Sequence, residues 1–275
     1  MISLPDFLSN HPELVLVEVR EAKGSTPREA GAYMLVAPDT SWGTIGGGQM
    51  ELLAIERAHT MLAAGETEDA FDLPLGPEIG QCCGGRVVID LTRLGEEERL
   101  ELLAREEKAR KALPQVFVFG AGHVGLALAA ALAPLPVATT VVETRPEAIE
   151  NLPRGVTGRL AALPEAVVGE IAPGGAAVIL THDHALDFLI AREALAREDL
   201  AYVGMIGSAT KRATFESAMR REGFASERSA RLVLPIGGDA VRDKRPPVIA
   251  AMVAAELMAA LLGKRTLSRQ TLRGG

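Results

Sequence analysis

The sequence predicts an α/β protein with two parts: a glycine-rich α+β domain at the N-terminus, then a Rossmann-like domain built on a doubly wound parallel sheet. In the second half, apolar strand candidates alternate with helix-like stretches. This alternation is typical of parallel sheets covered by helices. In the first half, strand candidates stand close together around glycine-rich loops, which is typical of a meander of neighbouring strands. A glycine motif between a strand and a helix supports the assignment of the second half.

The domain boundary is predicted by a change in composition. Residues 1–95 form the glycine-rich domain, residues 96–113 a helical linker and residues 114–275 the Rossmann-like domain with a C-terminal helix. The linker is rich in Glu, Lys, Arg and Leu, and Leu100 and Leu103 give it the spacing of an exposed amphipathic helix. Pro114 ends that helix because proline cannot donate a backbone hydrogen bond.

Composition excludes several classes of protein. The chain has 275 residues, is 48% hydrophobic and 24% charged, and carries a formal net charge of -7. We therefore expect no nucleic-acid partner. Two cysteines make no disulfide framework, which favours a reducing, cytoplasmic location. We see no signal peptide, and the apolar run 248–262 is too short for a membrane span, so no membrane association is expected.

In the first half, a glycine run leads into a predicted helix. Strands are expected at 14–19, 32–36 and 86–91, and a helix at 49–62. Gly46, Gly47 and Gly48 directly precede that helix, where exposed N–H groups form a natural seat for a phosphate. Arg28 lies in the preceding glycine-containing loop and would add positive charge. A plain tight turn is the alternative interpretation, and the sequence leaves both open.

The two cysteines stand side by side in the segment 80–85. Gln81, Cys82, Cys83 and Gly84 lie at its centre, with glycine on both sides of the cysteine pair. Adjacent cysteines are poorly placed for a disulfide to each other, and two ligands are too few for a closed zinc site. The segment is either a presented pair of thiols or a turn whose cysteines are small buried hydrophobes.

The second half opens with a strand at 116–119, the motif G-x-G-x-x-G and a helix to about residue 133. The motif places Gly120, Gly122, His123 and Gly125 where a nucleotide phosphate could bind. Glu143 ends the next strand at the spacing of a ribose contact. Further strands are expected at 156–160, 176–180, 202–206 and 231–234, with helices at 185–197, 209–222 and 248–262.

Two later strand ends carry polar side chains. His182 follows the strand 176–180, and Ser208 and Lys211 follow the strand 202–206. Ligands of open α/β sheets bind at this edge, and a basic residue in the first turn of a helix suits an anionic ligand. Helix capping by Asp183 and a structural hydrogen bond from a histidine are the alternative for the first of these segments.

The whole chain resembles the XdhC/CoxI family, the maturation factors of xanthine dehydrogenase and related molybdenum hydroxylases. The matching segments appear in the family's order: residues 24–32, 43–48 with Glu51, 83–85, 120–125, 182–184, and 202–208 with residues 211–212. The Gln81-Cys82-Cys83 form resembles the xanthine dehydrogenase branch most. The segment 239–245 departs from the family's pattern because it is more charged.

The resemblance implies a function that the residues alone do not. Members of the family bind the molybdenum cofactor, protect it while a cysteine desulfurase helps to install a sulfido ligand, and insert it into apo-xanthine dehydrogenase. The cofactor contact falls on Cys83, with Cys82 as its neighbour, and the motif residues named above join the site. Soft thiolate suits a molybdenum–sulfur ligand. The resemblance implies a dimeric carrier rather than an enzyme.

Two other hypotheses remain open from the residues. The motif at Gly120 together with Glu143 fits a nicotinamide-dependent oxidoreductase, although no substrate-domain catalytic set is evident. Cys82 and Cys83 also fit a thiol-dependent enzyme such as a sulfur transferase.

Overall fold

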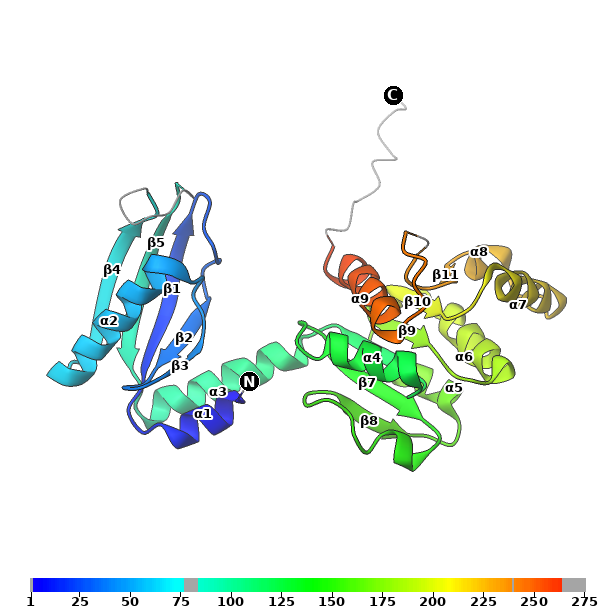
Figure 1. The fold of residues 1–275 in the computed structure, drawn as a ribbon, viewed down its shortest axis with the longest axis horizontal. Coiled ribbons are helices and arrows are strands. Elements are labelled where there is room, and N and C mark those ends of the chain that lie inside the picture. Colours follow the sequence, from blue (N-terminus) through cyan, green and yellow to red (C-terminus); the bar gives the residue numbers. More distant parts are fainter. Residues whose placement is uncertain (1, 77–83, 239, 264–275) are drawn as a thin grey trace, which may run out of the picture. The chain divides into compact units, whose positions relative to one another are not determined.

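A computed structural model describes residues 2–76, 84–238 and 240–263. The chain divides into two compact units, Met1–Ala109 and Arg110–Gly275 (Figure 1). Each unit has its own sheet and its own hydrophobic core. The predicted fold class, an α+β domain followed by a Rossmann-like domain, is confirmed.

The first unit contains a five-stranded antiparallel sheet. Its strand order is β3-β2-β1-β5-β4. The long central strand β1 pairs Val17 with Met34 on one side and with Leu91 on the other. The strands are β1 (Val15–Lys23), β2 (Tyr33–Val36), β3 (Ser41–Gly43), β4 (Glu68–Pro74) and β5 (Arg86–Arg93).

Helices cover both faces of this sheet. On one face α2 (Gly48–Ala64) buries Met50, Ala54, Ala58 and Met61 against the strands. On the other face α1 (Leu4–Asn10) and the first part of α3 (Glu96–Lys111) enclose a smaller core. Burial of this apolar surface is the main force that holds the helices to the sheet.

The second unit contains a six-stranded parallel sheet in the order β11-β10-β9-β6-β7-β8. The chain runs from the central β6 outward to β8, then returns to the other side of β6 at β9, which is the doubly wound arrangement. The strands are β6 (Gln115–Phe119), β7 (Ala138–Glu143), β8 (Thr157–Leu160), β9 (Ala176–Ile179), β10 (Tyr202–Met205) and β11 (Leu232–Val233).

Two layers of helix enclose this sheet (Figure 1). One layer consists of α4 (His123–Leu132) and α9 (Pro246–Leu262). The other consists chiefly of α5 (Pro164–Val167), α6 (His184–Ala196) and α7 (Ala209–Arg221), with α8 (Ser226–Ser229) beside them. The short 3-10 helices η2 (Pro146–Ala148) and η3 (Val168–Glu170) lie in the connections.

Several local expectations differ from the structure. The strand β4 was missed because its residues alternate between exposed and half-buried positions and include two Asp and a Pro, which depress strand propensity. In α3 the buried leucine is Leu102, whereas Leu100 is 65% exposed. The final helix α9 has an almost entirely apolar sequence, yet it buries one face and exposes alanines on the other.

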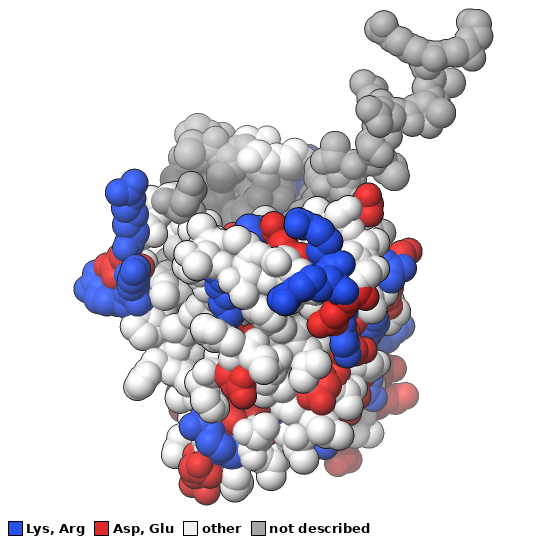
Figure 2. All heavy atoms as spheres, turned by 90° about the vertical axis from the view of Figure 1, so that its right-hand side faces the viewer, with Lys and Arg blue, Asp and Glu red and all other residues white. Residues whose placement is uncertain are grey.

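Charges on the outside of the protein are mixed in sign. Figure 2 shows Lys and Arg interspersed with Asp and Glu on the face that it presents. Many of these side chains form exposed ion pairs, such as that between Arg228 and Glu198 at 3.2 Å. Such pairs contribute little to stability. Within the described ranges, no helix has both the length and the apolar character needed to cross a membrane.

Candidate functional site

Three of the sequence motifs meet at one end of the first unit. The end of β1, the start of β2, the end of β3 and the β4–β5 hairpin all lie at this end of the sheet (Figure 1). It therefore carries the loop 24–32, the loop 44–47 and the segment between β4 and β5. Motifs that are far apart in the sequence, such as Gly24 and Gly85, become neighbours for this reason.

The loop that carries the cysteines has a fixed base. Beyond the last β4–β5 pair, Gly84 N donates to Leu75 O at 2.9 Å and Leu75 N donates to Gly85 O at 2.8 Å. A Cβ on Gly85 would lie 2.2 Å from the carbonyl oxygen of Ser25, so only glycine fits there. This contact places the loop 24–32 directly against the base of the cysteine loop. Gln81, Cys82 and Cys83 themselves lie outside the described residues.

The loop before α2 already holds a carboxylate. One oxygen of Glu51, Oε2, accepts from the Thr44 hydroxyl at 2.5 Å and from the backbone N–H groups of Ile45 and Gly47 at 3.1 and 3.0 Å. The seat for which the sequence predicts a phosphate is thus filled by the protein's own anion. Gly46, Gly47 and Gly48 all have positive φ, which glycine adopts without strain. Their binding of a phosphate stays a prediction.

This loop also belongs to the same end of the unit. A Cβ on Gly46 would lie 2.7 Å from Cβ of Pro27, so the loop 44–47 packs against the loop 24–32. Arg28, next to Pro27, is exposed and makes no hydrogen bond or ion pair with a described residue. It is therefore available to an anionic ligand at this end.

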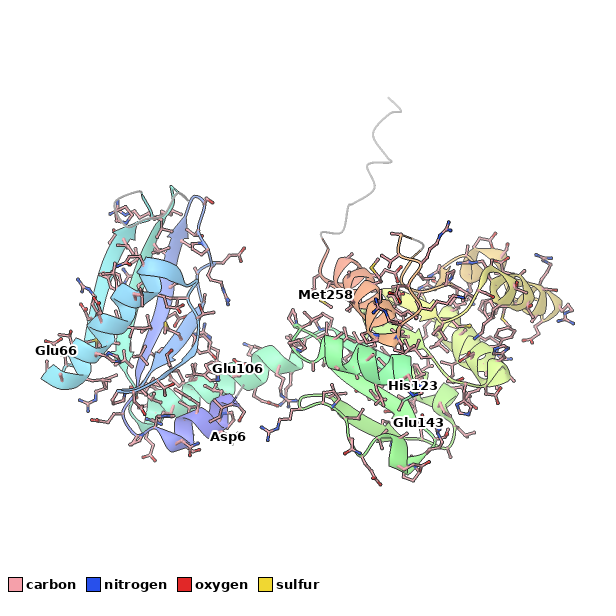
Figure 3. All side chains as sticks on the ribbon, in the orientation of Figure 1. Asp6, Glu66, Glu106, His123, Glu143 and Met258 are labelled. Carbon is pink, nitrogen blue, oxygen red and sulfur yellow. The ribbon has the colours of Figure 1, made fainter. Side chains whose placement is uncertain are left out.

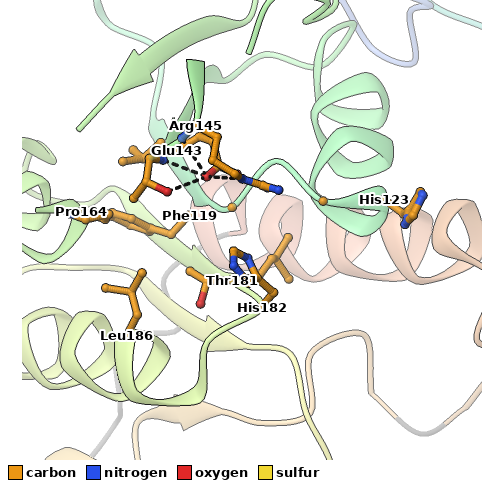
Figure 4. Close-up of a pocket in the computed structure, with 13 residues that line it drawn as sticks. Phe119, His123, Glu143, Arg145, Pro164, Thr181, His182 and Leu186 are labelled. Carbon is orange, nitrogen blue, oxygen red and sulfur yellow. Dashed lines mark hydrogen bonds and ion pairs between the residues drawn. The ribbon is translucent and has the colours of Figure 1, made fainter. Parts of the chain in front are cut away.

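A second candidate site is a cavity of about 290 Å³ in the second unit (Figure 4). It lies at the carboxyl ends of β6, β7 and β9, on both sides of the point where the strand order reverses. Ligands of doubly wound sheets bind at this point. The lining includes Gly120, Gly122, His123 and His182, all predicted from the sequence.

The three glycines of the motif differ in what surrounds them. A Cβ on Gly120 would lie 2.6 Å from the carbonyl oxygen of Leu180, and one on Gly125 would lie 2.0 Å from the carbonyl oxygen of Gly120. These two glycines allow close packing of strand, loop and helix. Gly122 caps the N-terminus of α4 without a side-chain hydrogen bond, and a Cβ there would meet nothing within 4 Å.

Glu143 ends β7 and is almost completely buried, with 5% of its surface exposed. Its Oε2 accepts from Ala121 N at 3.0 Å and from Arg145 Nη2 at 2.9 Å. Its Oε1 accepts from Thr144 N at 2.8 Å and the Thr144 hydroxyl at 3.1 Å, with longer contacts to Arg145. Burial acts to raise the pKa of Glu143, but the hydrogen bonds from Arg145, Ala121 and Thr144 outweigh it and lower the pKa to about 2.

The remaining polar lining of the cavity is cationic or neutral. Arg145 keeps 46% of its side chain exposed, and its Nη1 makes no hydrogen bond with a described residue. His182, which follows β9, and His123, at the start of α4, are also exposed. Figure 3 labels His123 and Glu143 in the second unit, and Figure 4 shows His123 away from the group of side chains around Glu143. Glu143 and Arg145 form an ion pair without net charge, and Nη1 of Arg145 is the donor of this pair that is left for a ligand.

A buried ion pair connects the segments that follow β9 and β10. Lys211 Nζ lies 2.5 Å from Oδ2 of Asp187, and these side chains are 10% and 0% exposed. Lys211 also donates to Ile206 O at 3.0 Å, while Asp187 Oδ1 accepts from the Thr181 hydroxyl at 2.6 Å. The ammonium predicted to bind an anionic ligand therefore has protein partners. The sequence did not single out Asp187, since an acid in the first turn of a helix is ordinary.

Other predicted groups have structural partners too. Ser208 caps α7 by accepting from Lys211 N at 3.3 Å, and Asp183 caps α6 by accepting from Ala185 N at 2.8 Å. Neither Ser208 nor Lys211 is among the residues that line the cavity. Among the described residues, no three His, Cys, Asp or Glu side chains are grouped so as to hold a metal ion.

Comparison with known proteins matches both units. Residues 116–257 match the XdhC Rossmann domain, and residues 8–72 match the XdhC and CoxI family. The chain belongs to the XdhC and CoxI family. The resemblance stated from the sequence is therefore confirmed.

Two relatives place this XdhC/CoxI-family protein further. It is 28% identical over 255 residues to the uncharacterized protein YqeB of Escherichia coli (strain K12), covering 88% of the chain but only 42% of that relative's length. Its structure is similar to the crystal structure of a xanthine dehydrogenase from Bacillus halodurans, with a TM-score of 0.77 over 98% of each chain. The identity in that comparison is 17%, so the likeness shows a shared fold.

Proposed function

We infer that this protein is an accessory factor of xanthine dehydrogenase that binds the molybdenum cofactor, protects it during sulfuration and inserts it into the apoenzyme. Membership of the XdhC and CoxI family supports this role. The observation that carries it is the meeting of three loops at one end of the first unit, around the base of the cysteine loop. A cysteine desulfurase is the partner that would supply sulfur, and the carrier would act as a homodimer.

The chemistry of the cofactor suits this end of the unit. Molybdenum bonded to sulfur is a soft centre, for which a Cys83 thiolate is a suitable ligand. Arg28 lies in the loop 24–32, is exposed and has no partner among the described residues, so it can pair with the cofactor's phosphate. Gly84 leaves open space at the base of the loop, since a Cβ there would meet nothing within 4 Å, whereas Gly24 and Gly85 pack against neighbouring backbone.

The internal carboxylate of Glu51 sets a limit on how the cofactor binds. A phosphate can reach the N–H groups of Ile45 and Gly47 only if the Glu51 side chain leaves them. We therefore assign the phosphate to Arg28 rather than to the glycine run. On this view Gly46, Gly47 and Gly48 shape the loop that packs on Pro27.

Cofactor retention tests the proposal. The purified protein is incubated anaerobically with molybdenum cofactor, desalted, and assayed for molybdenum by mass spectrometry and for pterin by fluorescence. We expect retention by the wild type, loss in Cys83→Ala, and a smaller loss in Cys82→Ala. Gly85→Ala should reduce retention because its Cβ would collide with the Ser25 carbonyl and displace the loop base.

A glycine outside the loop base provides the matched control. A Cβ on Gly95 would meet only the flexible carboxylate end of Glu98, so Gly95→Ala should retain the cofactor normally. Absence of pterin retention by the wild type, together with tight nicotinamide binding, would favour the alternative of an NAD(P)-dependent oxidoreductase and overturn the carrier role. Equal retention in the wild type and in Cys83→Ala would remove the thiol from the site.

A further inference from the structure

The cavity of the second unit has a ligand preference that the carrier role leaves unexplained. It lies where the sheet order reverses, next to a glycine loop that opens a ten-residue helix. Phosphate groups of nucleotides bind to such loops through backbone N–H groups. Its volume of about 290 Å³ is at the lower end of the range for small-ligand sites, enough for one nucleotide portion of a larger ligand.

Gly122 shows where a ligand would come close. Gly120 and Gly125 are required by contacts within the protein, whereas a Cβ on Gly122 would project into open space. The backbone at Gly122 has φ -74° and ψ -176°, which any residue adopts. Neither packing nor backbone conformation therefore calls for glycine at this position. The space that it leaves open borders the cavity, beside the uncapped N–H groups of α4.

Glu143 and Arg145 determine whether the site accepts a ribose with a free 2′-hydroxyl or one with a 2′-phosphate. In dinucleotide sites of this fold, an acid at the end of the second strand accepts the ribose 2′-hydroxyl, or a nearby arginine binds a 2′-phosphate. Here the acid at the end of the second strand is Glu143, and both of its oxygens already accept from Ala121, Thr144 and Arg145. A ribose hydroxyl would have to displace one of these donors.

Arg145 provides the second kind of contact, a cation that binds a 2′-phosphate. Two of its nitrogens, Nε and Nη2, are held by Glu143, which fixes the guanidinium at the edge of the cavity, and Nη1 is left over. A guanidinium is a preferred donor to phosphate because its N–H groups match the phosphate oxygens. Thr144 stands beside it in the lining and adds a hydroxyl.

The rest of the cavity suits a flat apolar group. Pro164 from α5 and Leu186 from α6 lie on one side of the cavity (Figure 4), and Leu180 after β9 also lines it. An adenine ring buries its faces against such side chains, as most small ligands do. The cavity thus joins an apolar slot, a partly exposed guanidinium and a glycine loop.

We propose that this cavity binds an adenine nucleotide with a 2′-phosphate, as in NADP(H), in preference to the unphosphorylated form NAD(H). The adenine lies between Pro164 and Leu186, the 2′-phosphate pairs with Arg145, and the 5′-phosphates meet the backbone at Gly122. Residues of the second unit alone line this cavity, so it adds a nucleotide ligand to the proposed cofactor carrier.

Calorimetric titration of the full chain with NADP⁺ and NAD⁺ tests the proposal, since the two ligands differ only by the 2′-phosphate. We expect NADP⁺ to bind at least about tenfold more tightly, because charge-assisted hydrogen bonds to the phosphate exist only for this ligand. Arg145→Gln should bring NADP⁺ down to the affinity of NAD⁺. Arg159→Gln is the matched control: Arg159 lies on β8, pairs with Glu170 at 3.0 Å and does not line the cavity.

A second test uses two glycine substitutions and does not depend on the Glu143–Arg145 contact. Gly122→Leu should weaken both nucleotides at least about tenfold without loss of fold, because its side chain enters open space beside the cavity. Gly169→Leu, at an equally open position in η3 outside the lining, should bind like the wild type. The proposal is overturned if neither nucleotide binds at millimolar concentration, if NAD⁺ binds as well as NADP⁺, or if Arg145→Gln leaves their ratio unchanged.

Discussion

The substitution Glu143→Gln tests the account of the cavity edge. Glutamine has nearly the same shape as glutamate but carries no charge, and its amide nitrogen cannot accept a hydrogen bond. In the variant, the N–H groups of Ala121 and Thr144 and the guanidinium of Arg145 would lose their shared carboxylate. The second unit should therefore become less stable at neutral pH.

The pKa of Glu143 sets the size of the expected loss in the free energy of unfolding. Its value of about 2 in the folded protein compares with an ordinary 4.5 in the unfolded chain. Each unit of difference corresponds to about 1.4 kcal/mol, which gives about 3 kcal/mol. Since Arg145 is 46% exposed and its charge is screened by water, we expect about 2 kcal/mol to be measured.

The sign of the pH dependence follows from the lowered pKa. Folding favours the ionised carboxylate, so the stabilisation is fully present above pH 4.5 and is lost as the pH falls toward 2. The free energy of unfolding of the wild type should exceed that of Glu143→Gln by about 2 kcal/mol at pH 6 to 7. This difference should shrink steadily below pH 4.5.

Urea unfolding at a series of pH values measures the difference. The single tryptophan, Trp42, lies in β3, so its fluorescence follows the first unit. Far-UV circular dichroism reports both units, and the part of the transition that fluorescence does not share belongs to the second. Glu170→Gln, which removes one member of an exposed pair, is the control and should cost less than about 1 kcal/mol. A pH-independent difference for Glu143→Gln would refute the reasoning.

Two further predictions concern buried polar groups. Lys211→Met should lower the free energy of unfolding of the second unit by about 3 to 5 kcal/mol, because Asp187 is fully buried and would lose its charged partner. The two tyrosines, Tyr33 and Tyr202, should stay un-ionised at pH 11 in the folded protein, because burial and a neighbouring carboxylate raise the pKa of both above its ordinary value. Absorbance near 295 nm measures the tyrosinate, and stability should fall as the pH rises above 10.

Controls separate these effects from a general loss of fold. For the ion pair, Arg192→Met removes an exposed cation that pairs with Glu193 and should cost less than about 1 kcal/mol. The double variant Lys211→Met/Asp187→Leu should recover much of the loss, and a double variant as unstable as the single one contradicts the argument. For the tyrosines, urea should release the full tyrosinate signal at pH 11. A full signal without urea contradicts the burial of the two hydroxyl groups.

The sequence predicted the second unit in more detail than the first. Parallel strands buried on both faces are short apolar runs, so β6, β9 and β10 could be recognised from composition alone. The motif at Gly120 then indicated the edge of the sheet that carries the cavity. By contrast, β4 has few apolar residues and gains its place by pairing with β5, which no local pattern reveals.

The candidate site was predictable in its parts but not in its contacts. Motifs identified Gly122, His182 and Glu143, because each lies at or just after the end of a recognisable strand. No pattern could show that the carboxylate of Glu51 fills its own glycine loop or that Lys211 pairs with Asp187. These contacts depend on side-chain positions after folding. A residue type at a strand end therefore indicates a site. Which of its hydrogen-bonding groups are available to a ligand must be read from the structure.

The two hydrogen bonds between Leu75 and the Gly84–Gly85 pair have a consequence for how this family can vary. They close the hairpin on the strand side of the cysteine segment, so the sheet register is set before that segment begins. Substitution or insertion between these residues would then cost the sheet little, because lengthening a connection between two paired strands adds only a small closure entropy. Selection could therefore alter the thiol chemistry of the segment while the domain that presents it stays folded.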